Sequence, residues 1–253
     1  MRIAAVVVAH GDAPFLASTL DSITGQSRAL DARIAICDIT TPQVDALVRD
    51  HGFVIHRATT TSRDVTTRIA HNFAQGVHAA DDCDLVVLGD HDDVWHIDRV
   101  GHHEAVARTF PGAVMLASDG RLIDSHGAPP GGTLRETFPV PAEWNDFDLR
   151  QQWTYVLRHS IATGGASAVV PHRVLRVAIP NGWLHDRWWS LLAVRDHGMV
   201  IDDAVVIDYR ISDDQRVGLD TQGQESTLRW MGKRAASLTR TMKRAADIAR
   251  LLV

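Results

Sequence analysis

The sequence predicts an α/β fold in which helices cover a mostly parallel central sheet. Short apolar runs rich in branched side chains alternate with segments of helical periodicity through the first 95 residues. The connections between them are short and contain Gly, Pro or Asp. In addition, Asp90, Asp92 and Asp93 directly follow one apolar run. Because ligands bind at the carboxyl ends of strands in open α/β sheets, this acidic tip is the predicted functional site.

The first 95 residues alternate in the order β-α-β-α-β-α-β. The first apolar run ends at His10-Gly11-Asp12, and Pro14 suits the first turn of the helix that follows. The three helices are expected to end at Gly25, Gly52 and Ala80. The expected strands are residues 3–9, 33–37, 53–56 and 85–88. No G-x-G-x-x-G or G-x-x-x-x-G-K-[ST] motif is present, which excludes a dinucleotide fingerprint and a P-loop.

The second half of the chain is less regular, with loops rich in Gly and Pro. Helices are expected at residues 97–109, 144–159, 171–179 and 183–198. Strands are expected at residues 113–117, 122–124, 166–170 and 199–207, and polar loops at residues 128–133 and 208–218. No internal repeat or linker is visible before Gly218, so residues 1–218 are expected to form one domain.

The acidic cluster has more than one interpretation. Adjacent carboxylates repel each other unless a cation neutralises them, and oxygen ligands suit Mg²⁺ or Mn²⁺. Alternatively, Asp93 or Asp98 simply caps the helix that begins near Ile97. Zinc is the weaker metal candidate, although four imidazoles lie nearby in the sequence: His91, His96, His102 and His103. Cys37 and Cys83 show no zinc-ligand spacing.

The composition is that of an ordinary soluble globular protein, with 45% hydrophobic and 23% charged residues. The N-terminal apolar run is too short for a signal peptide, and no run approaches the roughly 18 residues that span a bilayer. Two cysteines in 253 residues argue against a disulfide scaffold. We therefore expect a cytoplasmic protein.

Residues 219–253 are expected to form a separate, basic amphipathic helix. Residues 228–253 contain seven basic residues and one acid, although the whole chain has a net charge of −5. Apolar residues recur there at helical spacing: Leu228, Met231, Ala235, Leu238, Met242, Ala245, Ala249 and Leu252. Such a helix could pack on its own domain or on a second copy in a homodimer, or lie on an anionic membrane surface. The acidic remainder of the chain disfavours nucleic acid as a partner.

Several motifs occur in the order seen in one enzyme family. After the alternating first 95 residues come Asp90-His91-Asp92-Asp93-Val94-Trp95, Thr163-Gly164-Gly165 and His185-Asp186-Arg187-Trp188-Trp189. Over residues 1–218 the chain resembles the family 2 glycosyltransferases, and most of all their bacterial rhamnosyltransferase-like branch. The resemblance implies the GT-A fold, with residues 1–95 as the nucleotide-binding half and residues 96–218 as the acceptor-binding half. It also implies inverting, hexosyltransferase-type transfer from a dTDP- or UDP-sugar, such as dTDP-rhamnose, to a hydroxyl of a glycan or lipid-linked acceptor in polysaccharide biosynthesis.

The resemblance also implies roles for individual residues. Asp186 would be the catalytic base, and Asp90 and Asp92 would hold a Mn²⁺ or Mg²⁺ ion that bridges the donor diphosphate. The nucleotide-sugar donor would contact Ala9, His10, Asp38, Arg68, Asn72, Asp90 and His91. The acceptor would contact Gly164, Gly165, His185 and Trp188. Core packing is the alternative for Trp188 and for the neighbouring Trp189.

These residue types suit the chemistry. Inverting transfer needs a base that takes the proton of the attacking hydroxyl, and a carboxylate can do this. It also needs a Lewis acid that stabilises the departing diphosphate, which a metal held by other carboxylates supplies. Nucleotidyl transfer uses a similar sheet and metal, but usually has a Gly-rich, basic first loop, and residues 9–12 have neither feature.

The chain departs from the branch pattern at several positions. His91 replaces the usual Gln, Arg187 is an extra residue before the Trp pair, and Cys37-Asp38-Ile39-Thr40 stands where D-D-G-S is common. Ser212 stands where a histidine often completes the metal shell, with Asp213 or Asp214 as substitutes. The alternative function is therefore a catalytically impaired member that binds a nucleotide sugar or glycan, or acts as a scaffold.

Overall fold

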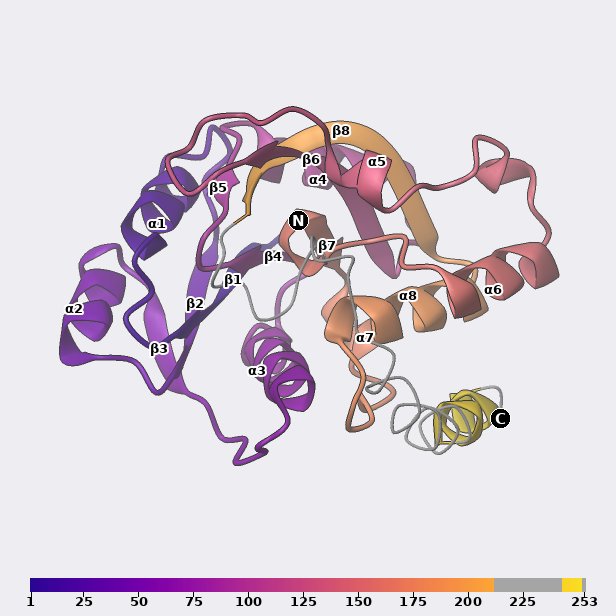
Figure 1. Cartoon of the computed structure of the whole chain (residues 1–253), viewed down its shortest axis with the longest axis horizontal. Coiled ribbons are helices and arrows are strands. Elements are labelled where there is room, and N and C mark those ends of the chain that lie inside the picture. Colours follow the sequence, from indigo (N-terminus) through magenta and orange to yellow (C-terminus); the bar gives the residue numbers. More distant parts are fainter. Residues whose placement is uncertain (212–242, 252–253) are drawn as a thin grey trace, which may run out of the picture. The chain divides into compact units, whose positions relative to one another are not determined.

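The computed structural model describes residues 1–211 and 243–251. The chain divides into two compact units, Met1–Asp214 and Gln215–Val253. The first unit is an α/β domain built on a mostly parallel sheet (Figure 1), which confirms the predicted fold class. In the second unit, residues 243–251 are helical. The rest of the expected basic helix lies outside the described residues.

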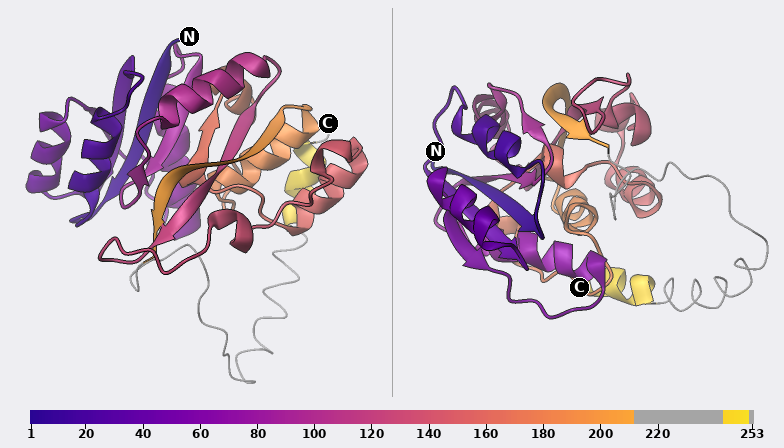
Figure 2. Two further views of the ribbon diagram at one scale, coloured as in Figure 1. Left: turned by 90° about the horizontal axis from the view of Figure 1, so that it is seen from above. Right: turned by 60° about the vertical axis from the view of Figure 1, so that its left-hand side comes forward.

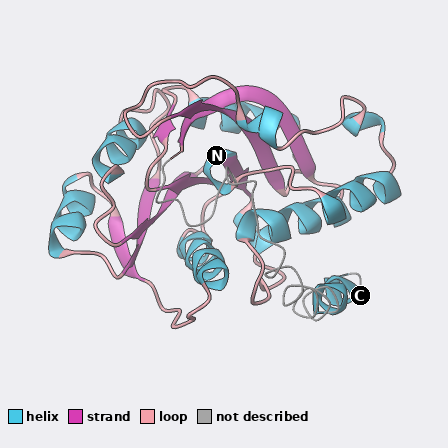
Figure 3. Ribbon diagram, in the orientation of Figure 1, coloured by secondary structure: helices cyan, strands magenta, loops and turns pink. Residues whose placement is uncertain are grey.

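Within the described residues, the sheet has eight strands in the order β3-β2-β1-β4-β7-β6-β8-β5. Strands are drawn in magenta in Figure 3. The strands are β1 (Ile3–His10), β2 (Ala32–Asp38), β3 (Val54–Arg57), β4 (Leu85–Asp90), β5 (Val94–Trp95), β6 (Met115–Ile123), β7 (Ser167–Val169) and β8 (Met199–Arg210). Strands β1 to β4 are parallel, as the sequence predicts. Strand β7 runs antiparallel between β4 and β6, whereas β6 and β8 pair in parallel.

Helices lie on both faces of this sheet (Figure 2). They are α1 (Leu16–Thr24), α2 (Pro42–Asp50), α3 (Val65–Ala79), α4 (Arg99–Thr109), α5 (Leu134–Thr137), α6 (Leu149–Arg158), α7 (Pro171–Val174) and α8 (His185–Arg195), with 3-10 turns η1 (Trp144–Asp146) and η2 (Gly164–Ala166). Helix α3 packs against β1, β2 and α8, whereas α4 packs against β4 and β6. No helix in the described part of the chain is both long and apolar enough to cross a bilayer.

Several elements of the second half differ from the prediction. Strand β6 is continuous rather than split in two, and the loop expected at residues 208–210 is part of β8, because these residues pair with residues 121–123. The helix expected at residues 144–159 is interrupted at Phe147, which is extended, and Asp148 caps the start of α6. The helix expected at residues 171–179 ends at Val174. The two residues of β5 are too few to show a periodic pattern.

The carboxyl ends of β1, β2 and β4 meet at one edge of the sheet. The register pairs His10 with Asp38 and Val8 with Asp90, so three polar side chains emerge from neighbouring strands. Strands β1 and β4 are buried along almost their whole length, as expected for parallel strands covered on both faces. The apolar strands therefore form a rigid support for the polar residues at their ends.

Candidate active site

Asp38, at the carboxyl end of β2, accepts hydrogen bonds from helix α3. Its Oδ2 atom accepts from Arg68 Nη2 at 2.6 Å and from Asn72 Nδ2 at 3.1 Å. His10 Nδ1 lies 3.5 Å from the same oxygen. Arg68 and Asn72 lie one turn apart on α3, whose N-terminus is capped by the side chain of Asp64. The structure thus brings together four of the residues that the resemblance assigns to donor binding.

The acidic loop after β4, residues 90–93, concentrates negative charge. Burial, together with the charges of Asp92 and Asp186, raises the pKa of Asp90 to about 7. Burial also raises the pKa of Asp92, although the charges of His91 and Arg210 oppose this effect. Within the described residues, no side-chain hydrogen bond engages the carboxylate of Asp90 or Asp92. Both carboxylates are therefore available to a ligand that carries positive charge.

Asp93, the last residue of this loop, is fully buried and has a different environment. Its Oδ1 atom accepts a hydrogen bond from the main-chain N–H of Arg210 at 3.1 Å, and its Oδ2 atom has no hydrogen-bond partner among the described residues. Burial and the charges of Asp92 and Asp90 raise the pKa of Asp93 well above its usual value. The structure corrects the capping interpretation in part: Asp98, not Asp93, occupies the N-cap position of α4, but its side chain makes no capping hydrogen bond.

Asp186 lies in the first turn of α8, within electrostatic reach of Asp90. Its Oδ1 atom accepts a hydrogen bond from the main-chain N–H of Arg187 at 2.6 Å. Burial raises the pKa of Asp186 to about 6, despite main-chain hydrogen bonds from Arg187 and Gly164. A carboxylate with this pKa is ionised at neutral pH and can still accept a proton, as a general base must.

Gly164 and Gly165 let the η2 turn pass close to these acids. A β-carbon added at Gly165 would overlap Oδ2 of Asp93 and would lie 3.1 Å from Oδ2 of Asp90. A β-carbon added at Gly164 would overlap the ring of His185. Any larger residue at these two positions must therefore displace the acidic loop or the start of α8.

Several residues that the sequence assigns to binding sites are buried, among them Asn72, Gly164 and Gly165. Ala9 is fully buried in β1. His185 is 4% exposed and stacks on Phe73 with 3.9 Å between ring centroids, and burial lowers its pKa to about 3. Trp188 is 1% exposed and packs edge-on against Trp183. His185 and Trp188 thus contribute to the packing of α8 and are not brought to an exposed surface.

Arg99 is a buried cation that sequence reasoning missed. It is 1% exposed, its guanidinium lies 4.0 Å from the centre of the Trp95 ring, and its Nη2 donates to the Leu88 carbonyl at 2.8 Å. Burial lowers the pKa of Arg99 to about 9, although the charges of Asp93 and Asp90 oppose this effect. No periodic pattern marks Arg99 as buried, because α4 lacks a clear apolar face.

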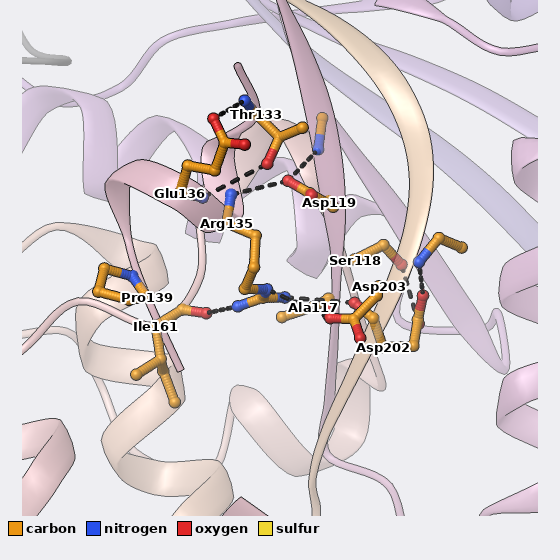
Figure 4. Close-up of polar contacts among 12 residues, drawn as sticks. Ala117, Ser118, Asp119, Thr133, Arg135, Glu136, Pro139, Ile161, Asp202 and Asp203 are labelled. Carbon is orange, nitrogen blue, oxygen red and sulfur yellow. Dashed lines mark hydrogen bonds and ion pairs between the residues drawn. The ribbon is translucent and has the colours of Figure 1, made fainter. Parts of the chain in front are cut away.

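A second polar network anchors the segment that leads to the glycine pair (Figure 4). Arg135 of α5 donates from Nη1 to the Ile161 carbonyl and from Nη2 to the Asp202 carbonyl, each at 3.2 Å. The main-chain N–H of Arg135 donates to Oδ1 of Asp119 at 2.8 Å. This network ties α5, β6 and β8 to a residue three positions before Gly164, and it was not predicted from the sequence.

The histidines near the acidic loop do not form a zinc site. His96, for example, is paired with Asp208, with 2.9 Å between Nε2 and Oδ1. Within residues 1–211 and 243–251, no three His, Cys, Asp or Glu side chains are placed to hold an ion together. A divalent ion held by Asp90 and Asp92 would therefore need further ligands from beyond the described residues.

No protein-family profile and no curated protein sequence matches this chain. Its fold, however, is similar to solved structures. TarS residues 1–349 from S. aureus, in complex with UDP, matches with a TM-score of 0.59 and 13% identity over 84% of this chain and 61% of that chain. Glucosyl-3-phosphoglycerate synthase from Mycobacterium tuberculosis, with Mn²⁺, UDP and glucosyl-3-phosphoglycerate, has a TM-score of 0.54 and 16% identity over 91% and 75% of the respective chains.

These similarities define the class of fold. The first unit has the GT-A fold of nucleotide-sugar transferases, as the resemblance in the sequence implies. The chain spans 37% of the longer TarS chain and about three-fifths of TarS residues 1–349.

Proposed function

We propose that the protein is an inverting glycosyltransferase of the rhamnosyltransferase-like branch of family 2. It would move a sugar from a dTDP- or UDP-sugar to a hydroxyl of a glycan or lipid-linked acceptor. The proposal depends mainly on one observation: η2 packs Gly165 against Asp93 and Asp90 and packs Gly164 against His185, and Asp186 lies within electrostatic reach of Asp90. Solved proteins with a similar fold support it, because TarS was solved with UDP-GlcNAc and glucosyl-3-phosphoglycerate synthase with UDP and Mn²⁺.

The nucleoside of the donor would lie against the cluster around Asp38. Arg68 and Asn72 fix the Asp38 side chain, so its carboxylate offers acceptor positions in a defined direction. The His10 side chain is 41% exposed and presents a flat ring beside that carboxylate. A fixed acceptor next to an exposed ring suits a nucleobase or a ribose hydroxyl. Ala9 would contribute only main-chain atoms, because its side chain is buried.

A Mn²⁺ or Mg²⁺ ion would be held by Asp90 and Asp92, with His91 beside the donor diphosphate. The two carboxylates fit this role because no side chain of the described residues engages them. Sites for these ions commonly combine one or two carboxylates with substrate phosphates. When bound, the ion supplies Lewis-acid stabilisation of the departing diphosphate. Arg99 offsets part of the negative charge of the same loop.

Asp186 would accept the proton of the acceptor hydroxyl as that oxygen attacks the sugar. Its main-chain hydrogen bond from Arg187 fixes the orientation of the carboxylate at the start of α8. Gly164 and Gly165 are buried against the acids and His185, so they would shape the acceptor site by letting η2 approach the acids rather than by contact with the acceptor. His185 would act through the packing of α8 rather than by contact with the acceptor.

Several predictions from the sequence fall on residues outside the described part of the chain. Ser212, which motivates the catalytically impaired alternative, is one of them. The domain boundary at residue 218 and most of the basic segment 228–253 are others. A catalytically impaired protein, a homodimer contact and a peripheral membrane contact therefore stay predictions.

Turnover by the full chain tests the proposal. UDP-, dTDP- and GDP-sugars are supplied with a panel of glycan acceptors, with Mn²⁺ or after chelation, and release of nucleoside diphosphate is measured. We expect metal-dependent release from one donor class, with loss of that release in Asp92→Asn and Asp186→Asn. Nucleotide-sugar binding without release would favour the binding-protein alternative. Neither binding nor release would contradict the proposed function.

A further inference from the structure

The end of strand β8 holds the acidic loop in place. Arg210, the last residue of β8, is 6% exposed. Its main-chain N–H donates to Oδ1 of Asp93 at 3.1 Å, and its Nε donates to the main-chain carbonyl of Asp92 at 2.9 Å. One residue thus fixes both the side chain of Asp93 and the backbone of Asp92.

The same guanidinium also reaches the turn that follows β6. Its Nη1 donates to the carbonyls of Asp124 at 3.0 Å and Ser125 at 3.3 Å. Its central carbon lies 4.3 Å from the centre of the Phe15 ring in the segment before α1. A guanidinium presents its donors in a rigid plane, so these simultaneous contacts fix its orientation. A lysine at Arg210 could reproduce the charge but only part of this set of contacts.

The choice of bonding partners indicates what Arg210 does. The side-chain hydrogen bonds that join Arg210 to the acidic loop and to the turn after β6 end on main-chain carbonyls. The backbone of Asp92 is therefore held while its carboxylate stays available to a ligand. The positive charge of Arg210 also favours the ionised form of Asp92.

We propose that Arg210 is a positioning residue for donor binding. It fixes the backbone of the acidic loop, which leaves the carboxylate of Asp92 available to hold the metal ion that would accompany the nucleotide sugar. This inference rests on the proposed function, and it adds a residue that touches neither donor nor acceptor.

Two variants and one control test this role in the full chain. Arg210→Met removes the charge and the donors but retains an apolar chain beside Phe15, and Arg210→Lys retains the charge. Arg121→Met is the matched control, because Arg121 pairs with Asp208 on the same two strands and its side chain is 52% exposed. Amide hydrogen exchange is measured without ligand. Binding is measured with Mn²⁺ and either UDP or dTDP, and kinetics are measured with Mn²⁺ and the corresponding nucleotide sugar.

We expect Arg210→Met to lose exchange protection at residues 91–93 and 124–127. The Kd for the metal nucleotide and the KM for the donor should rise about tenfold or more, as expected for loss of hydrogen bonds from a charged group. The kcat of the folded protein at saturating donor should change by less than about threefold, because such binding-site effects fall mainly on KM. Arg210→Lys should lie between wild type and Arg210→Met, and Arg121→Met should match wild type.

Wild-type KM and Kd in Arg210→Met would overturn the inference while the proposed function stands. A loss of kcat at unchanged KM would also overturn it. If Arg210→Met does not fold, Arg210→Lys tests the inference instead. Wild-type exchange protection and a wild-type KM in Arg210→Lys would show that the several hydrogen bonds of the guanidinium are not needed, and would overturn the inference. If the wild-type protein binds no nucleotide, the proposed function fails and the positioning role falls with it.

Discussion

Asp186 is the residue on which the proposed chemistry depends most. Asp186→Asn keeps the size of the side chain but removes the ability to accept a proton. We expect kcat to fall by about 10²- to 10⁴-fold, the usual contribution of a general base. The Kd for the metal nucleotide, measured by calorimetry, should stay at the wild-type value. An Asn variant with normal kcat would show that Asp186 is not the base.

The pKa of Asp186 also predicts how the rate depends on pH. Burial raises this pKa to about 6, and a base acts in its deprotonated form. The kcat at saturating metal and donor should therefore rise with pH up to about pH 6 and level off above it. The residual activity of Asp186→Asn should lack this rise. A wild-type profile that is flat between about pH 5 and pH 7 would contradict the assignment.

Ile39 follows Asp38 in a strained conformation. It has a φ of +55° and is 75% exposed, so a branched side chain occupies the left-handed region without burying apolar area in return. This strain costs about 1–2 kcal/mol. Ile39→Gly should therefore raise the free energy of unfolding by about 1 kcal/mol in a denaturant titration, after the entropy that glycine loses is subtracted.

A matched control for this prediction is Ile97→Gly. Ile97 is 63% exposed, and its φ is not positive. The free energy of unfolding of this variant should be unchanged or lower. If Ile39→Gly is also less stable than wild type, the strain argument is wrong. The resemblance to the D-D-G-S pattern places glycine at this position, and the backbone conformation of Ile39 gives the physical reason.

At the scale of elements, the close approach of η2 to the acidic loop is the feature most sensitive to side-chain size. In Gly165→Ala, the added β-carbon overlaps Asp93. We expect the free energy of unfolding to fall by about 1–3 kcal/mol, as overpacking of a buried site usually does. Donor binding should weaken with it. Gly112→Ala is the control, because its β-carbon would meet no atom within 4 Å; equal stability of the two variants would contradict the packing argument.

The elements that the sequence predicts well are those whose burial can be seen in the residues themselves. Strands β1 and β4 are unbroken apolar runs, and their ends are marked by polar residues. The sequence pattern predicts two strands where the structure has β6, because Ser118 and Asp119 interrupt the apolar run. In the structure, Ser118 donates to Asp202 and Asp119 accepts two main-chain hydrogen bonds, so these polar groups are satisfied within a buried strand. Periodicity cannot detect partners that are distant in the sequence.

The same limit applies to the candidate site. Asp38 and Asp90 are predictable because they end apolar strands, and Asp186 because it belongs to a motif. The contacts of Arg99 and Arg210 are not predictable in this way. Most of their hydrogen bonds go to main-chain carbonyls of distant segments, and carbonyls leave no mark on the sequence.

For the whole molecule, the acidic edge reduces stability when no ligand is bound. Burial and the charges of Asp92 and Asp186 raise the pKa of Asp90 from 3.8 to about 7, so the folded protein binds this proton more tightly than the unfolded chain does. The resulting penalty is absent below about pH 4 and complete above about pH 7. In thermal denaturation without metal, Asp90→Asn should therefore be more stable than wild type at about pH 8, and this difference should shrink toward about pH 4. A difference that does not change with pH would contradict this account.

The central claim is that the carboxyl edge of the sheet binds a nucleotide diphosphate together with a metal ion. Calorimetric titration of the wild-type chain, Asp38→Asn and Asp92→Asn with UDP and dTDP, each with and without Mn²⁺, tests this claim most directly. We expect the wild-type protein to bind one of the two nucleotides, and to bind it more tightly when Mn²⁺ is present. Asp92→Asn should lose the dependence on Mn²⁺, and Asp38→Asn should weaken binding both with and without the ion. No binding by the wild-type protein, or binding that neither variant changes, would contradict the account.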